Sequence, residues 1–99
     1  MWIEKIAILG AGQMGNGIAQ VAASAGFSVL MIDIKQDYVD NGMLAIENSL
    51  ARMVKKDRMS IEDADQALAR ISTATEKEAA ADADLVIEAI PEIPELKFS

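Results

Sequence analysis

Short apolar runs recur along the chain and predict β-strands. The runs are Lys5–Leu9, Val29–Ile32, Ile71–Thr73 and Leu85–Ile90. In the first two runs apolar residues follow one another without alternation, which indicates strands covered on both faces, as in parallel sheets. Pro91 follows the last run and ends it, because proline has no backbone N–H to donate to a neighbouring strand.

Longer segments between these runs have the hydrophobic spacing of helices. Met14–Ala25 predicts a helix, and Gly26 is a common residue just beyond a helix end. Its apolar stripe comprises Met14, Ile18, Val21, Ala22 and Ala25. A second, longer helix is predicted from about Asp37 to about Lys56, where Val39, Met43, Ile46, Leu50 and Met53 recur.

Polar residues mark the starts of two further helices. Ser60 with Asp63 three residues later has the spacing of a capping box, and it opens a helix that continues through Ala69. Thr75 and Glu78 have the same spacing and predict the cap of a short helix. Pro94 is suited to the first turn of another helix.

The alternation of strands and helices predicts an α/β fold with a Rossmann-type parallel sheet. A strand, a helix and a second strand in succession form a right-handed parallel crossover. We expect the strand order 3-2-1-4 and a two-helix insertion within residues 34–70, between strands 2 and 3. If the chain stands alone, the run 85–90 becomes an apolar edge strand, and we expect the chain to self-associate through it or to be poorly soluble.

A glycine motif follows the first strand and opens the first helix. Residues 10–15 read GAGQMG, and Asp33 comes at the end of the second strand. This spacing and context are the fingerprint of a dinucleotide site, although glycines also form ordinary turns. Gly10 allows the tight turn, Gly12 lets the backbone approach the pyrophosphate, and Gly15 lets the helix pack closely. The N–H groups at the start of the helix favour phosphate.

Asp33 favours NAD over NADP as the bound dinucleotide. A carboxylate accepts hydrogen bonds from the adenosine ribose hydroxyls, whereas it repels the 2′-phosphate of NADP. Lys35, two residues further on, weakens this preference slightly, although a lysine at this position is more often simply solvated.

Composition limits the binding partners and the cellular location that we expect for the protein. The 99 residues suit one domain, of which 52% are hydrophobic. The net charge of −7 argues against a nucleic-acid surface, since phosphate contacts need lysine and arginine. There is no cysteine, and we expect no metal site. Without a membrane-spanning run or room for a signal peptide, the expected location is cytoplasmic.

Several of these motifs together resemble the N-terminal domain of 3-hydroxyacyl-CoA dehydrogenases, which include 3-hydroxybutyryl-CoA dehydrogenases. The resemblance rests on GAGQMGNGIA at residues 10–19, on Asp33, on the helical insertion and on ADLVIEAIPE at residues 83–92. It extends from the first strand to Lys97. The glycine motif with Met14 is shared with other dehydrogenases, so the strand and the insertion make the resemblance specific.

The resemblance implies a set of binding residues. NAD would be contacted by Gly10, Gly12, Gln13, Met14, Gly15, Asp33, Glu92 and Lys97. By pattern alone, Glu92 and Lys97 would be read as a solvated loop acid and a helix surface lysine. An acyl-CoA substrate would be contacted by Ser49 and Lys56, both on the long helix.

A cluster of cations supports the coenzyme A assignment independently. Four of the nine basic residues lie within seven positions, at Arg52, Lys55, Lys56 and Arg58. Coenzyme A carries several phosphates, so an acidic protein that binds it needs a local cationic site. Cations also favour the C-terminal end of a helix for its dipole, and the sequence leaves both interpretations open.

No catalytic residue is predicted within the chain. The resemblance implies a histidine base oriented by a glutamate, and the sequence contains no histidine. Glu88, at the end of the fourth strand, is the best internal substitute, although a structural or cofactor-contacting role suits it better. We therefore expect residues 1–99 to be part of an NAD-binding domain whose helical substrate and dimerisation domain lies elsewhere, and the parent protein to be a homo-oligomer.

Two other functions fit the same residues. One is a non-catalytic protein of this fold that binds NAD as a structural component or as a sensor. The other is a different NAD(P)-dependent hydroxyacid dehydrogenase with the same type of N-terminal dinucleotide-binding domain. A histidine-containing segment in the parent reading frame favours the acyl-CoA dehydrogenase over both.

Overall fold

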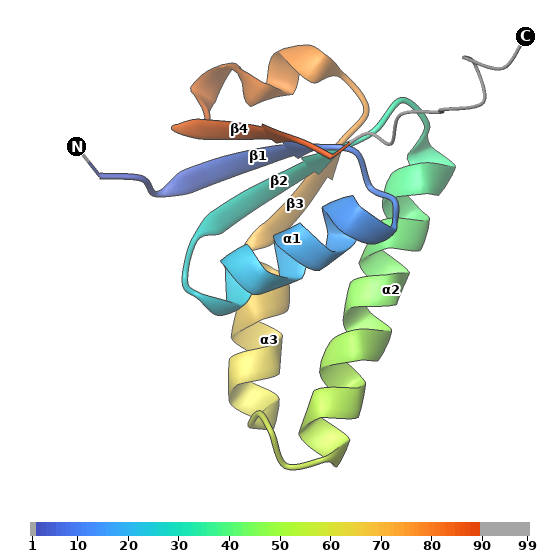
Figure 1. The fold of residues 1–99 in the computed structure, drawn as a ribbon, viewed down its shortest axis with the longest axis vertical. Coiled ribbons are helices and arrows are strands. Elements are labelled where there is room, and N and C mark those ends of the chain that lie inside the picture. The colour runs from blue at the N-terminus through green and yellow to red at the C-terminus, as the bar shows by residue number, and fades with distance from the viewer. Residues whose placement is uncertain (1, 90–99) are drawn as a thin grey trace, which may run out of the picture.

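Four parallel strands form one sheet in the order β3-β2-β1-β4 in the computed structural model, which describes residues 2–89 (Figure 1). The strands are β1 (Lys5–Leu9), β2 (Ser28–Ile32), β3 (Ile71–Ala74) and β4 (Leu85–Glu88). The predicted order is confirmed. The last strand ends two residues before the predicted end, and Ile90 is outside the described residues.

Three α-helices cover one face of this sheet, and a short 3-10 helix covers the other (Figure 1). They are α1 (Gln13–Ser24), α2 (Gln36–Lys55), α3 (Ile61–Ala69) and the 3-10 helix η1 (Lys77–Asp82). Helices α2 and α3 form the predicted insertion between β2 and β3. They make a hairpin whose turn lies far from the sheet. No helix in residues 2–89 is long and apolar enough to cross a membrane.

The core lies between the sheet and the three α-helices. Ile8 and Met31, from the two central strands, are fully buried. The α2 side chains that pack in the same core are Val39, Ile46 and Leu50, which are part of the predicted apolar stripe. These residues account for the regular helical spacing of apolar positions in the insertion.

Only part of the predicted apolar stripe of α1 packs on the core, namely Ile18 and Ala22, which are partly buried. The buried residues of α1 are Gly15, Ala19 and Ala23, one turn apart. Met14 and Val21, from the predicted stripe, are 58% and 71% exposed. Small side chains on the buried face let a crossover helix lie close to the strands, and this requirement determines which face turns inward.

One of the two predicted helix caps is confirmed. The Ser60 Oγ accepts a hydrogen bond from the Asp63 backbone N–H at 3.0 Å, as a capping residue does. The predicted cap at Thr75 is wrong, because η1 begins at Lys77 and its capping position is Glu76. Thr75 instead follows β3 directly and lines the pocket described below.

Asp84 joins the starts of two neighbouring strands. Its carboxylate accepts hydrogen bonds from the backbone N–H groups of Glu4 and Lys5, at 2.9 and 3.0 Å. These two bonds, with a smaller contribution from the charge of Lys5, lower the pKa of Asp84 below its ordinary value of 3.8. Asp84 therefore holds the segment before β1 against the start of β4.

Strand β4 forms one edge of the four-stranded sheet, as predicted. It pairs with β1 on one side. Leu85 and Val86 are 41% and 46% exposed, which is unusual for apolar residues of a parallel strand. The self-association expected from this edge stays a prediction.

Candidate functional site

The register of the sheet brings the ends of the strands together. Leu9 of β1 is paired with Ile32 of β2 and with Glu88 of β4, and Ile32 is paired in turn with Ala74 of β3. The residues that follow these strands therefore meet at the carboxyl edge of the sheet. The strand order changes direction at β1, because β2 and β3 are added on one side of β1 and β4 on the other. Open α/β sheets bind ligands at such a point.

The glycine loop leaves β1 in a conformation that requires glycine. Gly10 has φ of 120°, and its N–H donates to the Ile32 carbonyl oxygen at 2.6 Å. A Cβ on Gly15 would lie 2.7 Å from the Gly10 carbonyl carbon and closer still to its oxygen. A Cβ on Gly12 would meet nothing within 4 Å. Gly10 thus serves the turn, Gly15 serves the close packing of α1 on that turn, and Gly12 borders open space at the start of α1.

Asp33 is fixed in place by the glycine loop itself. Its Oδ2 accepts a hydrogen bond from the Ala11 backbone N–H at 2.8 Å, and its Oδ1 accepts one from the Ile34 N–H at 2.7 Å. The carboxylate is partly buried. An acid held in this way has a defined orientation before any ligand arrives, which limits the entropy lost on binding.

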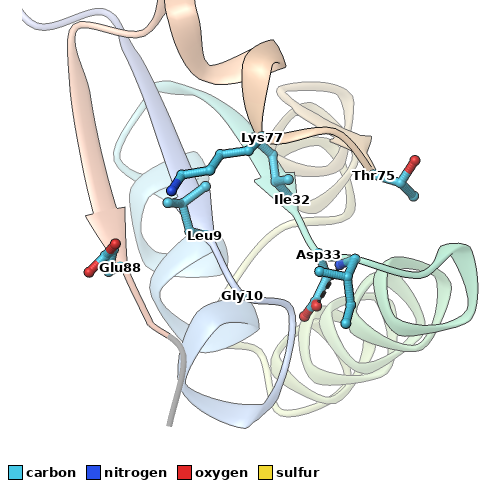
Figure 2. A pocket seen from close by; sticks show the side chains of 8 residues that line it. Leu9, Gly10, Ile32, Asp33, Thr75, Lys77 and Glu88 are labelled. Atoms are coloured by element: carbon cyan, nitrogen blue, oxygen red, sulfur yellow. Dashed lines mark hydrogen bonds between the residues drawn. The ribbon is translucent and has the colours of Figure 1, made fainter. Parts of the chain in front are cut away.

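A pocket of about 120 Å³ lies beside Asp33, at the carboxyl ends of β1 and β2 (Figure 2). It is lined by Leu9, Gly10, Ile32, Asp33, Ile34, Thr75, Lys77 and Glu88. Its lining combines apolar side chains with a few polar groups, as small-molecule sites do. The pocket brings together Gly10 and Asp33, the two ends of the predicted fingerprint.

Gln13 and Met14, at the start of α1, lie on the other side of the loop. With Gly12 and Ala89 they line a second hollow, of about 470 Å³. The Met14 side chain is 58% exposed there. The predicted contacts thus line two separate hollows, with Gly10 and Asp33 in one and Gly12, Gln13 and Met14 in the other. Glu92 and Lys97, which were also predicted to contact NAD, are outside the described residues.

Gly42, which the sequence analysis did not single out, positions the glycine loop. A Cβ on Gly42 would lie 2.8 Å from the Ala11 carbonyl oxygen and 2.9 Å from the Met31 Cε. Glycine at this position lets α2 approach the loop closely. Asn16 also contacts the loop, since its side-chain amide donates to the Ala11 carbonyl oxygen at 3.4 Å. A glycine in the middle of a predicted helix was the available signal.

Ser49 and Lys56, the predicted coenzyme A residues, lie on α2 away from the pocket. Seven positions separate them, which places them two turns apart on one side of the helix. Lys56 caps the C-terminal end of α2, and Ser49 is partly buried. A helix of 20 residues is about 30 Å long, so Lys56 is distant from the pocket at the start of α2.

The cationic cluster continues around the turn of the hairpin. Asp57 has φ of 58°, and the Arg58 N–H donates to the Met53 carbonyl oxygen at 2.9 Å, which closes the end of α2. Lys55, Lys56 and Arg58 are exposed around this turn. The sequence cluster is therefore a cationic surface in space, with its charges in solvent.

Glu88 ends β4 at the edge of the pocket with an exposed side chain. Figure 2 shows it on the strand opposite Asp33. Because Glu88 is exposed, burial supplies no reason to treat it as a general base. At this position Glu88 can contact a ligand in the pocket or remain hydrated.

Comparison with known proteins gives a consistent match. The family model for "3-hydroxyacyl-CoA dehydrogenase, NAD binding domain" matches residues 5–99. A 3-hydroxybutyryl-CoA dehydrogenase of Bradyrhizobium diazoefficiens is 47% identical over 95 residues, which are 96% of this chain and 32% of that protein.

Solved structures give the same result. The (S)-3-hydroxybutyryl-CoA dehydrogenase of Ralstonia eutropha superimposes with a TM-score of 0.90 at 42% identity, over 97% of this chain and 34% of that one. A diketoreductase described as acting on dicarbonyl compounds superimposes with a TM-score of 0.85 at 35% identity, over 98% of this chain and 35% of that one.

Proposed function

The chain belongs to the family of NAD-binding domains of 3-hydroxyacyl-CoA dehydrogenases, and we propose that it is the NAD-binding part of such an enzyme. It spans about a third of the length of the curated 3-hydroxybutyryl-CoA dehydrogenases that it matches. The observation that carries the proposal is the pocket at the carboxyl ends of the strands, where Gly10 and Asp33 meet.

The residues present fit NAD at this site. The start of α1 offers N–H groups to the diphosphate, and the space beside Gly12 admits a close approach. The Asp33 carboxylate is held at the pocket by two backbone N–H groups, where it would accept hydrogen bonds from the hydroxyls of an adenosine ribose. Met14 is exposed at the start of α1, in the hollow beside Gly12, where it would contact the bound cofactor.

The charge arrangement favours NAD over NADP. Asp33 would repel a 2′-phosphate on the ribose. Lys35, the nearest cation in sequence, does not line the pocket. Its ammonium lies 5.7 Å from the centre of the Tyr38 ring, at the start of α2. Lys35, which weakened the sequence argument for NAD, therefore lies over the Tyr38 ring and outside the lining of the pocket.

The proposed reaction oxidises the C3 hydroxyl of a 3-hydroxyacyl-CoA to a ketone. Bound NAD supplies the hydride acceptor for this step. The residues of this chain bind and orient the cofactor and carry no base for the hydroxyl proton, since the sequence contains no histidine. We propose that the base lies in the part of the relatives' length that this chain does not span. Residues 1–99 alone would bind cofactor without catalysing the reaction.

We propose that Ser49 and Lys56 bind the coenzyme A part of the substrate. The cationic surface around Lys56 supports this proposal, because the rest of the chain is acidic and coenzyme A is polyanionic. Glu92 and Lys97 remain proposed NAD contacts on the family resemblance. A cytoplasmic location and a homo-oligomeric assembly also stay predictions.

Another NAD-dependent oxidoreductase is the second candidate. The similarity to a diketoreductase supports it, since that protein is described as acting on dicarbonyl compounds. The two candidates differ in their need for coenzyme A. The cationic surface is required by the first and has no assigned partner in the second.

Calorimetric titration of the chain with coenzyme A distinguishes the candidates. We expect saturable binding that Lys56→Gln weakens several-fold, because one exposed ion pair is lost. Arg70→Gln provides a control with equal loss of charge, since Arg70 lies at the other end of α3 and donates to the Ala23 carbonyl oxygen. Equal affinity in wild type and Lys56→Gln would remove the coenzyme A assignment and favour the second candidate.

A further inference from the structure

The pocket beside Asp33 has an unfavourable charge for a dinucleotide. Two of its lining residues, Asp33 and Glu88, are carboxylates, and the diphosphate of NAD is also anionic. The whole chain has a net charge of −7, so its long-range potential also repels the ligand. The N–H groups at the start of α1 offset part of this repulsion. A cation within the pocket would offset the remainder.

Lys77 is the one cation that lines the pocket among the described residues. It is the first residue of η1, on the face of the sheet opposite α1. Figure 2 shows its side chain extended across the pocket from η1 toward Leu9 and the β4 side. The Lys77 side chain therefore lies along the pocket, with its ammonium near Leu9 at the end of β1.

Local structure does not account for a lysine at this position. The N-terminal end of a helix carries a partial positive charge, which disfavours a cation in the first turn. Glu78, the next residue of η1, has the sign that this end prefers. Lys77 is also exposed, so it contributes no burial to the core. Its orientation over the pocket remains as the feature to explain.

We propose that Lys77 attracts the anionic dinucleotide to the pocket beside Asp33 and raises the affinity of the site. The ammonium offsets the repulsion between the ligand and the carboxylates of Asp33 and Glu88. Asp33 then selects the unphosphorylated ribose, while Lys77 supplies electrostatic attraction for the anionic ligand as a whole. This inference rests on the proposed function, since it names a further residue of the same NAD site.

The test measures the dissociation constant of NADH by nicotinamide fluorescence at low and high salt. Lys77→Met keeps the length of the side chain and removes its charge. We expect it to weaken NADH binding about two- to fivefold at about 20 mM salt, the range for an exposed ion pair. At about 500 mM salt the variant and wild type converge, because screening removes the lost attraction. Lys77→Arg retains the charge and is expected to retain the affinity.

Lys35→Met is the matched control, since Lys35 lies outside the pocket, over the Tyr38 ring. We expect its NADH affinity to equal that of wild type. Equal affinity of Lys77→Met and wild type at low salt would overturn the inference and leave the proposed function intact. A loss in Lys77→Met that persists at high salt would also overturn it, because that loss would be structural. No NADH binding by folded wild type would instead overturn the proposed function.

Discussion

The backbone N–H of Ala11 donates to the Oδ2 of Asp33 at 2.8 Å. This bond joins the glycine loop to the acid that follows the second strand, across 22 positions of sequence. The two parts of the dinucleotide fingerprint are therefore one hydrogen-bonded unit. The loop is in turn held by α2, through the close approach at Gly42. The geometry of the site thus depends on both crossovers that flank β2.

Gly15→Ala is expected to destabilise the protein, and Gly17→Ala is the matched control. The new methyl group at residue 15 would overlap the Gly10 carbonyl, which is backbone and cannot rotate away. We expect a loss of about 1–3 kcal/mol or more in the free energy of unfolding. At residue 17 a Cβ meets nothing within 4 Å, so alanine gains helix propensity of about 1 kcal/mol. Urea unfolding monitored by circular dichroism measures both. Equal stability of the two variants would contradict the packing role of Gly15.

Gly42→Ala is expected to weaken cofactor binding without touching the cofactor. Its Cβ would lie 2.8 Å from the Ala11 carbonyl oxygen, so either α2 or the loop must move. We expect a several-fold rise in the dissociation constant of NADH, with overpacking of about 1–3 kcal/mol partly offset by helix propensity. Asn41→Ala, on the exposed side of the same helix, serves as control. Wild-type affinity in Gly42→Ala would show that the loop tolerates displacement.

Asp84→Asn is expected to change the dependence of stability on pH. The pKa of Asp84 is lowered in the folded state, mainly by the N–H groups of Glu4 and Lys5, so the folded protein binds its proton less readily than the unfolded chain does. The stabilisation is complete above the unfolded pKa and is lost as the pH falls through the folded pKa.

Wild type should therefore exceed Asp84→Asn in stability at neutral pH, and the difference should shrink below about pH 4. Urea unfolding at a series of pH values measures this difference. Asp65→Asn, at an exposed position of α3, provides the control. A difference that stays constant with pH would show that the carboxylate charge of Asp84 is unimportant.

The features that the sequence predicted correctly are those encoded by neighbouring residues. Buried parallel strands have continuous apolar runs, and Gly10 and Asp33 stand at fixed distances from their strand ends, so pattern and spacing suffice. The cap at Ser60 is likewise local, since it depends on a partner three residues away.

The features that were missed depend on tertiary contacts. The apolar stripe of α1 indicated a helix but only part of its buried face, because the small residues Ala19 and Ala23 lie closest to the sheet while Ile18 and Ala22 pack beside them. Gly42 meets a loop that lies 31 positions away in sequence, and nothing in its neighbours shows this. Lys77 reaches the pocket only because the register aligns four strand ends.

The most direct test of the account compares NADH and NADPH binding by wild type and Asp33→Ala, with nicotinamide fluorescence as the signal. We expect wild type to bind NADH saturably and NADPH more weakly. In Asp33→Ala, NADH affinity should fall roughly tenfold, since the ribose loses a charged hydrogen-bond acceptor, and discrimination against NADPH should disappear. Equal binding of the two cofactors by folded wild type, or an unchanged preference in Asp33→Ala, would contradict the assignment of this pocket to NAD.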